Sequence, residues 1–139
     1  MPEIKLSTQQ VLQMFQGEQT KLEIIQRNRI TLQNLIREQL LAIDSLNAVQ
    51  NTKENEQIIV PLGAGVFLDA SLKNNKEVQA SITGDVIVKE SIPKVINKIE
   101  ARKKETIEKD MELAREQERI IQNLKNMERI LQQASRKRE

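Results

Sequence analysis

Two long segments of the chain carry apolar residues at alternating spacings of four and three, which is the heptad pattern of a coiled coil. They cover residues 7–50 and 91–136. In the first, eight of twelve seam positions are apolar: Val11, Phe15, Glu18, Leu22, Ile25, Arg29, Leu32, Ile36, Gln39, Ile43, Leu46 and Gln50. In the second, nine of thirteen are apolar: Ile92, Ile96, Ile99, Lys103, Thr106, Asp110, Leu113, Gln117, Ile120, Leu124, Met127, Leu131 and Ala134.

Each segment predicts a helix about 65 Å long, which is too long to bury its seam in a globular core. If the chain folds back on itself, positions whose numbers sum to about 142 face each other, and the two apolar seams coincide; Ile43, for example, would face Ile99. The pattern therefore predicts an antiparallel two-helix coiled coil. Polar seam residues such as Arg29, about one layer from Asp110, are expected to fix its register.

Both segments begin with helix-start signals. Ser7 followed by Gln10 is a predicted capping box. Ser91 is a predicted cap, and Pro93 lies in the first turn, where a missing N–H costs little.

The composition argues against catalysis. The chain has no histidine and no cysteine, and therefore lacks the commonest general base and the usual zinc ligands. The sequence PLGAG lacks the spacing and the lysine of a phosphate-binding loop. We expect a protein that is not an enzyme and that has no cofactor and no metal site.

Charge and hydropathy restrict the partners. Residues 91–139 carry 13 basic and 9 acidic side chains, and their interspersed signs are typical of a solvated helix rather than a nucleic-acid interface. No apolar stretch approaches the roughly 20 residues that span a bilayer, and the first residues do not resemble a signal peptide. We expect a cytoplasmic protein that binds neither nucleic acid nor membrane.

Residues 57–90 differ from the rest because they alternate with the period of β-strands. A run at 58–60 that stops at Pro61, an alternating run at 66–72, and runs at 78–82 and 86–88 predict four strands in two hairpins. Gly63 and Gly65 indicate a bulge or corner where φ is positive.

Two small hairpins are not stable unless other strands or helices pack against them, and their edges expose unpaired backbone N–H and C=O groups. We therefore expect this region to mediate assembly with other chains. The residues predicted for oligomerisation are Val60, Gly63, Gly65, Val66, Phe67, Leu68, Val86, Ile87 and Val88.

The stretches VPLGAGVFLDASL and VQASITGDVIVKESIPKVINKIEARKKE resemble the hairpins and second helix of the prefoldin alpha subunit family. The resemblance covers residues 58 to about 105, and it implies a mainly α fold with a small β region: a single prefoldin-like domain over residues 1–139 whose two hairpins join an intersubunit β-barrel. It also implies a chaperone that works without ATP. Two alpha-type and four beta-type subunits would form a hetero-hexamer that holds unfolded clients and passes them to a group II chaperonin.

Apolar residues at the two chain ends exceed what a two-stranded seam can bury, which favours client binding there. The predicted client-binding residues are Val11, Leu12, Met14, Phe15, Met127, Ile130 and Leu131, and Ile4 and Leu6 add to the same apolar end. Alternatively, these residues seal the coil end or contact a neighbouring chain. Alternative functions are a scaffolding coiled coil and a prefoldin-like adaptor subunit with a defined partner.

Overall fold

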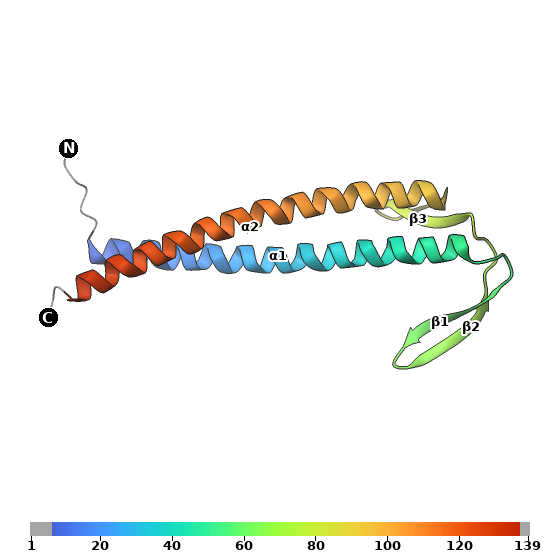
Figure 1. The fold of residues 1–139 in the computed structure, drawn as a ribbon, viewed down its shortest axis with the longest axis horizontal. Coiled ribbons are helices and arrows are strands. Elements are labelled where there is room, and N and C mark those ends of the chain that lie inside the picture. Colours follow the sequence, from blue (N-terminus) through green and yellow to red (C-terminus); the bar gives the residue numbers. More distant parts are fainter. Residues whose placement is uncertain (1–6, 137–139) are drawn as a thin grey trace. The chain divides into compact units, whose positions relative to one another are not determined.

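The computed structural model describes residues 7–136, without the side chains of residues 82 and 83. Along the chain, two long helices flank four strands (Figure 1): α1 (Thr8–Asn51), β1 (Gln57–Gly63), β2 (Val66–Ser71), β3 (Glu77–Thr83), β4 (Val86–Ser91) and α2 (Ile92–Arg136). The predicted mainly α fold with two hairpins is confirmed. The chain divides into two compact units: a helical unit that combines the chain up to Leu35 with the chain from Thr106 onward, and a unit at Ile36–Glu105 that contains both hairpins.

The start of α1 has the predicted capping box. The backbone N–H of Gln10 donates to Ser7 Oγ at 3.2 Å, and the backbone N–H of Ser7 donates to Gln10 Oε1 at 3.0 Å. These two bonds satisfy donors that would otherwise be orphaned at the helix end. Within residues 7–136, neither helix contains a stretch long and apolar enough to cross a bilayer.

The seam prediction is confirmed along both helices. Every predicted seam position is buried or half-buried, whereas the remaining helix positions are largely exposed. The most buried seam side chains are aliphatic, including Ile25, Ile43, Ile92 and Ile120. Because apolar area removed from water is the main favourable term, this narrow seam supplies most of the stability of each helical segment.

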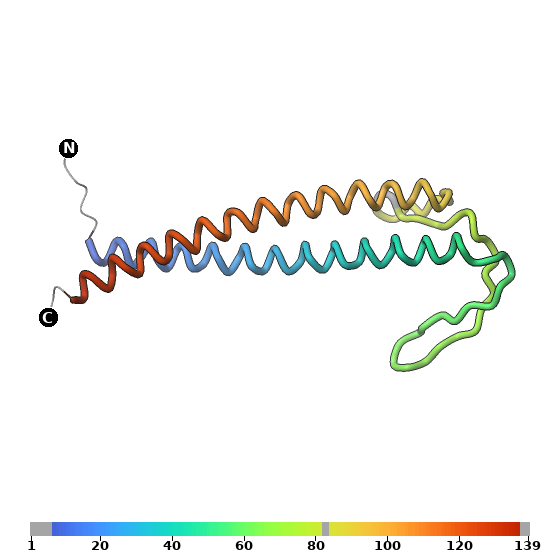
Figure 2. The backbone as a smooth tube through the Cα atoms, viewed as in Figure 1, coloured from blue at the N-terminus to red at the C-terminus, as the bar shows by residue number. Residues whose placement is uncertain are grey.

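The four strands form two separate antiparallel hairpins, β1–β2 and β3–β4, which follow one another along the chain after α1 and before α2 (Figure 2). The expectation that the first strand stops at Pro61 is wrong. β1 continues to Gly63, and Pro61 is in register with Phe67. A proline is tolerated here because each strand of an isolated hairpin has an unpaired edge, where a missing N–H costs nothing.

The two hairpins form an internal repeat: each has the same pairing pattern, shifted by 20 residues along the chain. Ile58 pairs with Ala70 as Val78 pairs with Glu90, and in both hairpins the pairing register shifts directly before the last residue of the first strand. The closing bonds also correspond: the N–H of Leu72 donates to the Glu56 carbonyl and the N–H of Ile92 to the Lys76 carbonyl, both at 2.9 Å. Hairpin β1–β2 and hairpin β3–β4 are therefore equivalent modules.

The turn of hairpin β1–β2 depends on positive φ, as predicted from its glycines. Gly63 and Gly65 have φ of +107° and +79°, and Ala64 between them has φ of +52°. Positive φ at both central residues is the requirement of a type I′ turn, whose twist matches that of the strands. A Cβ added at Gly65 would meet no other atom within 4 Å, so its constraint is conformational and not steric crowding.

Replacing Gly65 by valine should therefore impair assembly. A β-branched residue at this φ is strained by about 2 kcal/mol, and the turn would shift or open. We expect less full-sized complex by light scattering with unchanged helical circular dichroism. Ala64→Gly, which relieves a positive φ in the same turn, is the matched control and should assemble normally. Full assembly and normal thermal stability of the valine variant would contradict the conformational role of Gly65.

Candidate functional site

The hairpins expose the apolar residues that the sequence predicts for assembly. Phe67, Val66 and Leu68 of β2 are exposed, as are all three predicted residues of β4, Val86, Ile87 and Val88. Val60 is half-buried, and Gly63 and Gly65 form the exposed turn. Two other apolar side chains of β1, Ile59 and Leu62, are also exposed and were not among the predicted residues. Such a concentration of exposed apolar side chains is typical of an interface.

Hairpin β3–β4 contacts the start of α2 through a salt bridge and a buried apolar side chain. Lys98 Nζ lies 2.6 Å from Glu90 Oε1, while the second carboxylate oxygen of Glu90 is buried without a hydrogen-bond partner. Val95 is buried and, with Ala80, lines a cavity of about 130 Å³ between the hairpin and the helix. Sequence reasoning missed Val95 and the Glu90–Lys98 pair because neither belongs to the heptad seam; the register of the hairpin is needed to find them.

The start of α1 and the end of α2 belong to the helical unit and lie at the same end of it in Figure 1. The predicted client-binding residues divide into two groups here. Leu12, Met14 and Ile130 are 45%, 46% and 51% exposed. The other four belong to the seam, with Val11 buried and the rest half-buried: Phe15, Met127 and Leu131. Ile4 and Leu6 lie outside the described residues.

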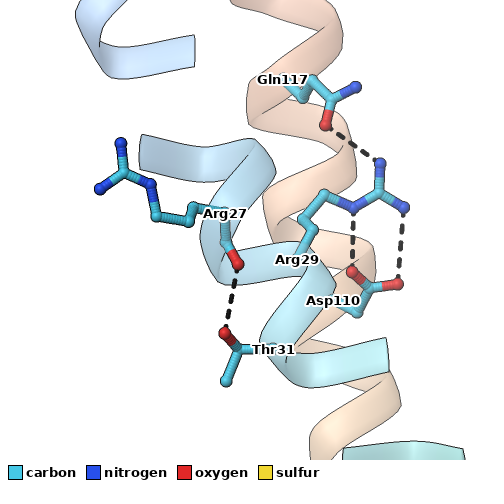
Figure 3. Close-up of polar contacts among 5 residues, drawn as sticks. All are labelled: Arg27, Arg29, Thr31, Asp110 and Gln117. Carbon is cyan, nitrogen blue, oxygen red and sulfur yellow. Dashed lines mark hydrogen bonds and ion pairs between the residues drawn. The ribbon is translucent and has the colours of Figure 1, made fainter. Parts of the chain in front are cut away.

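A polar cluster interrupts the apolar seam of the helical unit (Figure 3). Arg29 Nε donates to Asp110 Oδ1 at 2.9 Å, and Arg29 Nη1 donates to Gln117 Oε1 at 3.1 Å. The Arg29 and Asp110 side chains are only 23% and 16% exposed. The predicted pair of seam residues thus lies in direct contact, where it can fix the register of the helices.

Comparison with known families decides the assignment. A family model described as "Prefoldin subunit" matches residues 9–137. The chain belongs to the prefoldin family.

Curated prefoldin relatives indicate the alpha class. "Prefoldin subunit alpha" of Thermofilum pendens is 30% identical over 83 residues, which are 60% of this chain and 64% of the relative. "Prefoldin subunit alpha 1" of Methanocaldococcus jannaschii is 26% identical over 137 residues, 94% of this chain and 87% of the relative. The chain thus spans just under two thirds of the length of the Thermofilum relative. These likenesses support an alpha-type prefoldin subunit.

Solved prefoldin structures share the fold. A chain of the filamentous prefoldin of Methanocaldococcus jannaschii matches with a TM-score of 0.70 at 12% identity, covering 81% of this chain and 93% of that one. The prefoldin beta subunit of Thermococcus strain KS-1 matches with a TM-score of 0.61 at 16% identity, covering 96% of each chain. Prefoldins are chaperones without enzymatic activity, and their subunits assemble with other prefoldin subunits.

In this prefoldin subunit the Arg29–Asp110 pair also determines how Arg29 responds to pH. The hydrogen bond that the Arg29 guanidinium donates to Asp110 raises the pKa of Arg29 above its ordinary value; burial opposes this effect, and the negative charge of Asp110 adds to it. A raised pKa means that the contribution of Arg29 to stability is complete below the pKa of the unfolded arginine and is lost only in strongly alkaline solution. Arg29 therefore stays positively charged in ordinary buffers and continues to donate its hydrogen bonds to Asp110.

Removing Asp110 should destabilise the coil markedly. Asp110→Ala leaves the Arg29 guanidinium in the seam without its carboxylate, and we expect a loss of about 2 kcal/mol in the free energy of unfolding, measured by urea denaturation. The double variant Arg29→Leu/Asp110→Leu should recover the parent stability, because apolar pairs replace such ion pairs without loss. If the alanine variant matches the parent, the ion pair does not stabilise the native register.

Proposed function

We propose that the chain is the alpha-type subunit of an ATP-independent holdase that binds non-native polypeptides at the free ends of its coiled coil. The observation that carries the proposal is the exposure of Leu12, Met14 and Ile130 beside the seam of the helical unit. A two-helix seam does not need these side chains, and exposed apolar side chains near the helix ends favour binding of apolar segments. Met14 suits clients of varied shape because its side chain is flexible and polarisable.

In this proposal the whole chain acts as one prefoldin-like domain, and its hairpins join those of other subunits in a β-barrel. Two alpha-type and four beta-type subunits form the complex, which acts in the cytoplasm and delivers clients to a group II chaperonin. The support comes from membership of the prefoldin family and from the exposed strand edges and apolar side chains of both hairpins.

The test is suppression of aggregation without nucleotide. The chain is assembled with a beta-type partner, and chemically unfolded client proteins of unrelated sequence are diluted into it while light scattering is recorded. A holdase suppresses scattering by all of them in proportion to its concentration. A scaffold or adaptor with one defined partner leaves the scattering of unrelated clients unchanged, and that result would refute the proposed function.

A further inference from the structure

The two hairpins are joined to the helices in different ways. β4 ends at Ser91 and α2 begins at Ile92, so no connector separates them, and Ile92 is fully buried. Hairpin β1–β2 instead lies between two connectors, residues 52–56 after α1 and residues 72–76 before β3. A direct junction of strand and helix leaves few backbone torsions free to turn, whereas two connectors leave many.

The connectors are hydrogen-bonded to each other. Asn75 Nδ2 donates to the carbonyl of Thr52 at 3.0 Å, and the N–H of Asn55 donates to the carbonyl of Leu72 at 2.6 Å. None of these four residues belongs to β1 or β2. The bonds therefore hold the connectors together at the base of hairpin β1–β2, but they do not hold its strands against a helix.

Hairpin β3–β4, in contrast, has side-chain contacts with α2. Lys98 Nζ donates to Glu90 Oε1 at 2.6 Å, and the Glu90 side chain is only 10% exposed. The cavity of about 130 Å³ between hairpin and helix is lined from β3, β4 and α2 by Ala80, Ser81, Glu90, Val95, Lys98, Ile99 and Arg102. The hairpin therefore lies alongside about the first three turns of α2.

The internal repeat shows that hairpin β1–β2 cannot make the same contacts. A shift of 20 residues places Ala70 at the position of Glu90, because Ala70 pairs with Ile58 as Glu90 pairs with Val78. Alanine has no carboxylate to accept a bond from a lysine. In addition, residues 72–76 follow β2 where α2 follows β4, so the equivalent of Lys98 is not on a helix.

We propose that the Glu90–Lys98 pair holds hairpin β3–β4 against α2 as one rigid body, whereas hairpin β1–β2 turns independently on residues 52–56 and 72–76. The inference concerns the single chain and goes beyond the proposed holdase function, on which it does not rest. In an assembled prefoldin subunit, hairpin β3–β4 then keeps its direction relative to α2, and hairpin β1–β2 adjusts its direction to a neighbouring subunit.

The burial of Glu90 explains why this contact depends on Lys98. One carboxylate oxygen of Glu90 is bonded to Lys98, and the other is buried without a hydrogen-bond partner. Removing the ammonium group leaves a buried carboxylate poorly compensated, which favours movement of the hairpin away from the helix until water reaches the carboxylate. The Lys98 side chain is 38% exposed, so the ammonium group can also leave toward water and release the hairpin.

Distances between pairs of spin labels test the difference between the hairpins. The chain contains no cysteine, so labels attach only at introduced cysteines. Lys104→Cys on α2 is combined with Lys89→Cys on β4, or with Asp69→Cys at the equivalent position of β2; all three positions are exposed. The labelled full chain is diluted into an excess of unlabelled chain, so that distances within one chain are measured.

We expect the distance distribution of the Asp69 pair to be roughly twice as broad as that of the Lys89 pair, because the connectors leave more torsions free. Equal widths would overturn the inference. No client and no other type of subunit is present, so a negative result leaves the proposed function unaffected.

Variants of Lys98 and Glu90 then test the role of the ion pair. Lys98→Met or Glu90→Gln should broaden the distribution of the Lys89 pair to about the width of the Asp69 pair, because either change removes the attraction between the two groups. Lys98→Arg retains a cation and should keep the distribution narrow. Lys94→Met, at an exposed position one turn earlier in α2, is the matched control and should also keep it narrow. A narrow distribution in both Lys98→Met and Glu90→Gln, or equal broadening by Lys94→Met, would overturn the role of the Glu90–Lys98 pair.

Discussion

Replacing Leu12, Met14 and Ile130 together by serine should strongly weaken the suppression of client aggregation while leaving the complex assembled. All three side chains are about half exposed, so serine removes little of the apolar area that holds the coil together. Full burial of an aliphatic side chain contributes roughly 1.5–3 kcal/mol, and partial burial against a client about 1 kcal/mol. Three such losses weaken a single arm roughly 100-fold.

The loss is magnified in an assembly. Several arms that hold one client act at high effective concentration, so weakening both arms that this chain supplies lowers the overall affinity far more than weakening one. The measurement is light scattering of an unfolded client at several chaperone concentrations. Ile24→Ser/Ile30→Ser/Met111→Ser is the matched control, because these residues are 50%, 59% and 51% exposed away from the helix ends.

The control variant should protect clients as well as the parent does. Equal loss in both variants would mean that exposed apolar residues anywhere along the arm bind the client, and undiminished protection by the first variant would refute the role of the ends. Val11, Phe15 and Leu131 are less suitable targets than the exposed residues, because they are buried or half-buried in the seam and their replacement would also loosen the coil.

Replacing Val66 and Leu68 by aspartate should prevent assembly and preserve the helices. Both residues lie on the same face of hairpin β1–β2 as Val60, and their side chains are 54% and 52% exposed in the single chain. Burying an unpaired carboxylate in an intersubunit sheet costs several kcal/mol, which corresponds to a more than roughly 1000-fold weaker association. Helical circular dichroism should stay close to that of the parent, because the coil seam is untouched.

Light scattering coupled to size-exclusion chromatography measures the outcome. Gln57→Asp/Ser71→Asp introduces the same two charges at an exposed pair near the base of the same hairpin, on its other face. This control should assemble. A full-sized complex from Val66→Asp/Leu68→Asp would show that the hairpins are not the assembly interface.

Heptad spacing predicted the coiled coil well because burial in a two-helix seam depends on little else than that spacing. The layer count placed Arg29 about one layer from Asp110 but could not predict the hydrogen bonds between them, since long side chains reach along the helix axis. Val95 was missed for a related reason: the seam was counted through its neighbour Ile96, and the packing of Val95 at the junction of a helix and a hairpin is visible only in the structure.

In the hairpins, residue preferences correctly predicted a positive φ at Gly63 and Gly65, but they were misleading for two neighbouring residues. Pro61 was read as a strand end because proline is rare in sheets, although an edge accommodates it. Ala64 was not predicted to adopt a positive φ, since alanine rarely does so; the tight turn between two glycines imposes it. The chemical difference between the two hairpins required the observed register, because a shift of one residue exchanges the faces of a strand.

Because equivalent hydrogen bonds recur every 20 residues in the two hairpins, a whole hairpin could be removed or added between the helices. The N–H of Ile92 finds the carbonyl of Lys76 just as that of Leu72 finds the carbonyl of Glu56, so a chain joining Glu56 directly to Glu77 would offer Ile92 an equivalent acceptor. Deleting or inserting one 20-residue unit changes the number of hairpins by one and leaves the entry to α2 as it is. A contiguous deletion of another length inside one strand would shift that strand against its closing bond, whereas a change of one whole hairpin preserves it.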